Sequence, residues 1–120
     1  MRLAFWTAAT FAFVMAASPH PIEMPGAPSD KIQHIIAFAT LGLLGASAYP
    51  ATTLVQLALR LSLFGAAIEL VQAIPPLHRD SSVLDWIADT MACSAALAAV
   101  GWWRSSRERA DRPRHLSDGD

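Results

Sequence analysis

The sequence ELVQAIPPLHRDSSVLDWIAD, residues 69–89, joins the end of one apolar segment to the start of the next. Glu69 lies inside the first segment, Pro75 and Pro76 end it, and Asp85 and Asp89 lie inside the second. A charged side chain inside a membrane-spanning helix costs about 2.5 kcal/mol or more, so such residues usually have a function or a partner. The stretch therefore predicts two membrane-length helices that meet around carboxylates.

Composition agrees with a membrane protein. The 120 residues are 53% hydrophobic and 16% charged, which differs from an ordinary soluble domain. Apolar runs of near membrane length, ended by prolines, predict an all-α polytopic protein with four transmembrane helices. The predicted transmembrane domain covers residues 1–103, with helices at about 3–18, 31–49, 52–74 and 83–103.

Basic residues predict the orientation. Five of the nine lysines and arginines follow residue 103, and Arg2 lies on the same side of the membrane, whereas Lys31 and Arg79 lie on the other side. The positive-inside rule then places both termini in the cytoplasm. Residues 104–120 form an Arg-rich cytoplasmic tail that we expect to be disordered.

The first apolar segment has two interpretations. Arg2, the apolar run and the small residues Ala16, Ala17 and Ser18 also fit a cleavable signal peptide. We favour a retained helix because further spans follow it. Cleavage would leave three helices in the same orientation.

Ionisable and amide side chains gather at one depth. At helical rise, His34 lies one turn inside its helix, Glu69 about 7 Å and Asp89 about 9 Å from the external ends of theirs. Three pairs share a helix face each: Asp30 with His34, Glu69 with Gln72, and Asp85 with Asp89. We therefore expect a polar cluster in the external leaflet.

The helix ends assign roles to some of these residues. Ser82 followed by Asp85 matches a capping box, so Asp85 has a structural explanation. Glu69 lies toward a helix C-terminus, where the dipole disfavours an anion, so we expect it to be protonated or paired with a cation. His34 is the hypothesised partner. Glu69 and Gln72 also fit a simpler role as hydrogen-bonding contacts between helices.

The ordered set of motifs resembles the VanZ-like family of small membrane proteins. The resemblance covers about residues 19–101 and is carried by Asp30-Lys31-x-x-His34 with Phe38, by Glu69-x-x-Gln72, and by Arg79 with Asp85. Asp89 is a departure, because the family more often has asparagine there. The resemblance implies a multi-pass protein of the bacterial plasma membrane with a role at the cell envelope, linked to resistance to the glycopeptide teicoplanin. It implies no reaction.

Three functions follow from the cluster. The first is binding of a lipid, lipid-linked sugar or peptide at the external leaflet, by Asp30, Lys31, His34, Glu69, Gln72, Arg79, Asp85 and Asp89. The second is an intramembrane acid-base enzyme acting on a lipid-linked envelope substrate, with His34, Glu69 and Asp89 as catalytic candidates. The third is a structural or assembly role in the membrane.

Other classes are disfavoured. A site for a hard divalent ion is possible at His34, Glu69, Asp85 and Asp89, but their spacing follows no metal motif, and one histidine among carboxylates argues against zinc. We therefore predict no metal and no cofactor. Polar residues on one side only argue against ion transport. The basic tail lacks aromatic residues and is diluted by acidic ones, which argues against nucleic acid.

Overall fold

The computed structural model describes residues 1–19, 29–77 and 81–112, and these contain helices and no strands. The elements are α1 (Arg2–Ala17), α2 (Asp30–Ala48), α3 (Leu54–Gln72), a 3-10 turn (Pro75–Leu77) and α4 (Val83–Asp111). The predicted all-helical fold is confirmed. The observed ends lie within two residues of the predicted ones, except at the end of α4.

Three helices, α2, α3 and α4, are long and apolar enough to cross a membrane. The length and composition of these helices are those of membrane-spanning segments. Helix α1 is apolar but shorter, at 16 residues. A fourth span in α1 remains a prediction.

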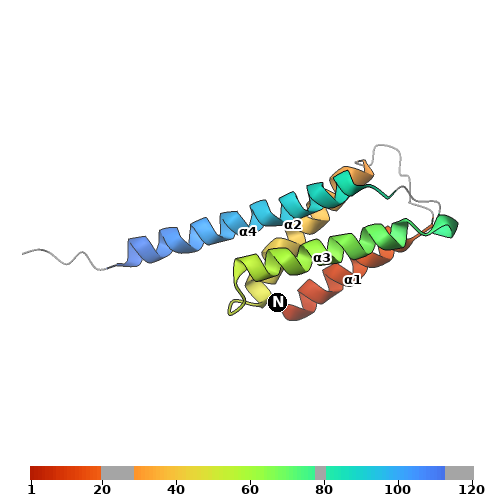
Figure 1. The fold of residues 1–120 in the computed structure, drawn as a ribbon. Helices are drawn as coiled ribbons and strands as arrows, with labels where there is room; N and C mark the ends of the chain where they lie inside the picture. Colours follow the sequence, from red (N-terminus) through yellow and green to blue (C-terminus); the bar gives the residue numbers. More distant parts are fainter. Residues whose placement is uncertain (20–28, 78–80, 113–120) are drawn as a thin grey trace, which may run out of the picture.

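The four helices form a bundle in which α4 and α1 lie on opposite sides of α2 and α3 (Figure 1). The contact between α2 and α4 is the most extensive in the described chain. Helix α1 ends, α2 begins, α3 ends and α4 begins at the same end of the bundle, which we call the site end (Figure 1). The predicted cluster residues from three helices are thus brought to one end.

A small residue sets the distance between α2 and α4. A Cβ atom added to Gly42 would lie 3.1 Å from the backbone oxygen of Cys93 and 3.4 Å from the Cβ of Ala96. Cys93 is fully buried, and Phe38 one turn earlier on α2 is nearly so. Small residues allow close approach of membrane helices, which compensates for the weak hydrophobic drive in lipid. Gly42 therefore allows α2 and α4 to pack closely.

At the opposite end of the bundle, two arginines bind the C-terminus of α2. The Ala46 carbonyl would normally accept from residue 50, but Pro50 has no N–H, and Arg104 Nη2 donates to this oxygen instead at 2.7 Å. Arg2 Nε donates to the Ala48 carbonyl at 3.5 Å, with its guanidinium 5.2 Å from the Tyr49 ring centroid. Cations also suit the negative end of the helix dipole.

Helix α4 continues beyond the predicted end at residue 103 and reaches Asp111. The extension is rich in arginine, with glutamate and alanine, which are good helix formers. The Arg107 guanidinium stacks on Trp103, 4.1 Å from the ring centroid, and Ser106 donates to the Trp102 carbonyl. Residues 104–111 of the predicted tail are therefore helical. The predicted disorder of 113–120 lies outside the described residues.

Replacing Gly42 with leucine should destabilise the bundle. The added side chain would meet backbone of α4, which cannot move aside, so we expect a loss of about 1–3 kcal/mol. Thermal unfolding in detergent, followed by circular dichroism, measures this. The matched control is Ala67→Leu on the exposed face of α3, which should leave the unfolding temperature almost unchanged. Equal behaviour of the two variants would contradict a close contact at Gly42.

Candidate functional site

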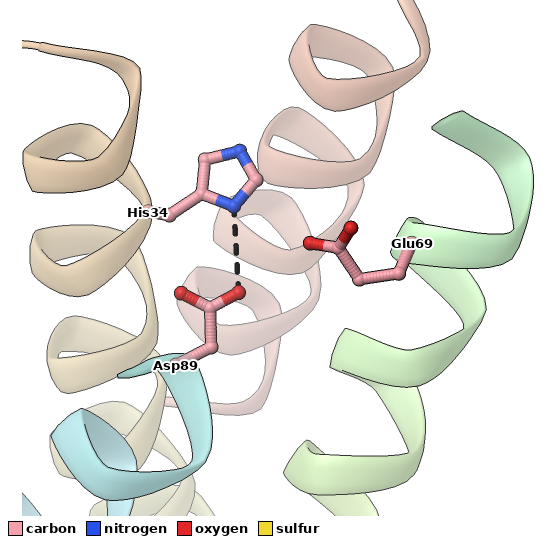
Figure 2. Close-up of side chains that lie close together, drawn as sticks. All are labelled: His34, Glu69 and Asp89. Carbon is pink, nitrogen blue, oxygen red and sulfur yellow. Dashed lines mark hydrogen bonds and ion pairs between the residues drawn. The ribbon is translucent and has the colours of Figure 1, made fainter. Parts of the chain in front are cut away.

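A histidine on α2 and an aspartate on α4 form the centre of the site. His34 Nδ1 lies 3.4 Å from Asp89 Oδ2, and Figure 2 shows the two side chains facing each other. The Asp89 side chain is only 1% exposed, so its carboxylate has lost nearly all contact with solvent or lipid headgroups. Burial of an unpaired carboxylate is unfavourable, so the imidazole of His34 is a necessary partner.

Glu69 reaches across from α3 to the start of α4. Its Oε2 accepts hydrogen bonds from the Ser82 backbone N–H at 2.9 Å and from the Ser81 hydroxyl at 3.2 Å. Ser82 is the N-cap residue of α4, and its own side chain makes no capping hydrogen bond. The predicted capping box of Ser82 with Asp85 is therefore wrong, because Glu69 occupies the N–H that Asp85 would have bound.

This contact also explains how Glu69 tolerates its position. At the end of α3, the helix dipole disfavours a negative charge, and the sequence suggested protonation or a cation as the remedy. The structure shows a third way to stabilise the charge. The Glu69 carboxylate lies against the N-terminus of α4, where N–H groups and the helix dipole favour an anion.

His34, Glu69 and Asp89 converge from three helices (Figure 2). Each offers one ligand atom, and these atoms all lie within 4.8 Å of one another. Glu69 is 8% exposed. Three buried oxygens have no hydrogen-bond partner among the described residues. Two of them, Glu69 Oε1 and Asp89 Oδ1, belong to this group, and the third, Asp85 Oδ1, forms an ion pair with Lys31. We call His34, Glu69 and Asp89 the triad.

Other predicted site residues lie apart from the triad. Lys31 Nζ forms an ion pair with Asp85 Oδ1 at 3.2 Å, and the lysine side chain is 54% exposed, so the pair contributes about 0–1 kcal/mol. Gln72 is buried, and its Nε2 donates to the Ala16 carbonyl at 3.2 Å, which fits a contact between α3 and α1. The Asp30 side chain and the whole of Arg79 lie outside the described residues.

A pocket of about 430 Å³ lies beside the triad, with α1 on one side and α2 on the other. Most of its lining is apolar, including Phe11, Ala12 and Leu41. His34 belongs to both the pocket lining and the triad. The pocket therefore offers a space for an apolar chain that leads to a polar group.

Sequence reasoning missed Ser81 and the contribution of α1 to the pocket. Serines before a helix are ordinary N-cap signals, and nothing in their spacing shows that a carboxylate from another helix binds there. The apolar residues of α1 predict only a membrane segment, because the same types of apolar residue face lipid and line pockets.

No protein-family model, curated protein or solved structure matches this chain. The resemblance to the VanZ-like family therefore remains a prediction from the residues.

The pairing of His34 with Asp89 can be measured with a double-mutant cycle. His34→Ala and Asp89→Ala should destabilise the protein less than additively when combined, with a coupling of about 0.5–3 kcal/mol, because each change removes the partner of the other. Unfolding by denaturant in mixed micelles measures the coupling. The control is the cycle of Lys31→Ala with Asp85→Ala, where exposure should reduce the coupling to below about 1 kcal/mol. Additive losses at His34 and Asp89 would exclude their interaction.

Glu69 variants separate hydrogen bonding from charge. Glu69→Ala removes the acceptor of the Ser82 N–H and should cost about 1.5–3 kcal/mol, whereas Glu69→Gln keeps an oxygen acceptor and should cost less. The free energy of unfolding in detergent compares the two. If Glu69→Gln is as destabilising as Glu69→Ala, the capping hydrogen bond is not the main contribution of Glu69.

Proposed function

We propose that this protein binds a lipid or lipid-linked sugar in the external leaflet of a bacterial plasma membrane, with the polar head at the triad and the apolar chain in the pocket. The observation that carries the proposal is the position of His34, which lines the apolar pocket and faces the buried Asp89. An amphipathic ligand fits such a site because apolar walls and a few polar groups separate its two parts.

The walls of the pocket favour a chain over a compact ligand. Lining residues on α1 run from Ala8 to Ala16, a length of about 12 Å at helical rise. The polar residues Gln33 and His34 line the pocket near the start of α2, and Thr40 lines it further along the same helix. An acyl or prenyl chain lying between α1 and α2 would thus direct its head toward His34.

The charges of the triad select the head group. Two carboxylates attract hydroxyl and amine donors and repel a bare phosphate. A sugar or an amine-bearing head is therefore favoured, and both groups donate hydrogen bonds to oxygens such as Asp89 Oδ1 and Glu69 Oε1.

The proposed orientation has both termini in the cytoplasm and α1 as a fourth, retained span. It is supported by Arg2 and Arg104, which bind the C-terminus of α2 at the end away from the triad. Helix α1 also contacts the rest of the bundle through the bond from Gln72 to Ala16 and forms one wall of the pocket. A VanZ-like role at the cell envelope, linked to glycopeptide susceptibility, fits a site in the external leaflet.

Lipid content tests the proposal. Ala12→Phe should fill the pocket and reduce copurified lipid at least about threefold, as measured by native mass spectrometry of protein released from mild detergent. Ala4→Phe is the matched control, since Ala4 is exposed on the same helix and outside the pocket lining, and it should leave the bound lipid unchanged. Equal lipid content in both variants would refute binding in this pocket.

An acid-base enzyme is the second candidate, favoured by the carboxylate of Asp89 beside the His34 ring. An aspartate in this position orients an imidazole and stabilises its charged form, as a general base requires. The same mass spectra distinguish the two functions. An inactive His34→Gln enzyme would retain a substrate of different mass from the molecule bound to the wild type, whereas a binding protein would hold the same molecule or less of it.

A further inference from the structure

We propose that His34, Glu69 and Asp89 bind a single divalent cation of the Mn²⁺ type. The sequence predicts no metal here, because the three residues lie on three separate apolar segments and follow no metal motif. The fold brings them together from α2, α3 and α4 (Figure 2). This proposal concerns the same triad as the proposed head-group site, but the ion needs no lipid to bind, so each proposal can fail without the other.

The geometry suits one ion between the three side chains. Two ligands bound about 2.1 Å from one ion lie about 3.0–3.4 Å apart in octahedral or tetrahedral coordination. His34 Nδ1 and Asp89 Oδ2 are 3.4 Å apart. The full set of ligand atoms lies within 4.8 Å, so a shift of about 1 Å in the Glu69 carboxylate completes the set.

Buried oxygens without partners point to the ligand. Asp89 is 1% exposed and Glu69 8%, and one oxygen of each has no hydrogen-bond partner among the described residues. Buried polar atoms are nearly always bonded, so two such oxygens close together need an explanation. A cation between them would bind both.

The net charge of the triad also favours a bound cation. With both carboxylates ionised and a neutral imidazole, the triad carries a net charge of about −2 in a region of low dielectric. Among the described residues, neither Glu69 nor Asp89 forms a salt bridge with a lysine or arginine, and Lys31 is already paired with Asp85. A divalent cation neutralises this charge, whereas a monovalent one leaves a residual negative charge.

The ligand types select the ion. One imidazole nitrogen with two carboxylate oxygens is too poor in oxygen ligands for Ca²⁺, which takes six to eight, and Mg²⁺ dehydrates reluctantly. Mn²⁺ accepts carboxylates and tolerates an imidazole, with water or a ligand head group filling the remaining positions. His34 lines the pocket, which provides a path for the ion and brings it next to any bound molecule.

Mn²⁺ binding to the full chain in detergent tests the site. Electron paramagnetic resonance counts free Mn²⁺ during titration, and we expect one ion bound per chain. Asp89→Asn and Glu69→Gln should each weaken binding at least about tenfold. Asp85→Asn is the matched control, because Asp85 is a carboxylate at the same end that pairs with Lys31, and it should leave the affinity unchanged.

A spectroscopic signature and a folding control complete the test. Bound Mn²⁺ should show coupling to a ¹⁴N nucleus of His34 in electron spin echo spectra, and this coupling should be lost in His34→Gln. Mn²⁺ should also raise the unfolding temperature of the wild type but not that of Asp89→Asn. An unfolding transition in Asp89→Asn that Mn²⁺ does not shift shows that the variant folds without binding the ion. Absence of one-to-one binding at 1 mM Mn²⁺, equal losses in Asp85→Asn, or absence of the ¹⁴N coupling would overturn the proposal.

Discussion

The burial of the Asp89 carboxylate is the constraint on which the rest of the structure depends. At 1% exposure the group requires a partner, and His34 on α2 provides one at 3.4 Å. This pairing requires α2 and α4 to lie close together. Gly42 makes that possible, because its missing side chain lets the Cys93 backbone approach the helix. The most extensive helix contact in the described chain thus lies around its most deeply buried carboxylate.

The second feature that organises the structure is the set of hydrogen bonds and ion pairs at the start of α4. Glu69, from the end of α3, takes the Ser82 N–H that a local capping residue would have bound. Asp85 is left to pair with Lys31 on α2. Carboxylates from one helix hairpin therefore link three helices at the site end, and their charge gathers where helix dipoles favour it.

Much of the fold was predictable because it depends on local sequence. Apolar length and prolines predicted the helices, and Ser29 before α2 is a residue type that commonly caps helices, with its hydroxyl accepting from the Ile32 N–H. Depth along the helices grouped His34, Glu69 and Asp89 correctly. The end of α4 was misplaced by the change from apolar to charged residues, although arginine and glutamate sustain a helix as well as leucine does.

The sequence by itself determined that the chain forms apolar helices of membrane-spanning length with polar groups at one end, because hydropathy, proline positions and helical rise are properties of each segment alone. Only the tertiary structure decided which groups pair: His34 with Asp89, Glu69 with Ser82, Asp85 with Lys31, and α1 with the pocket. The reason is physical. Depth specifies one coordinate of a side chain, whereas a partner also depends on the rotation and neighbours of its helix, which side-chain packing sets.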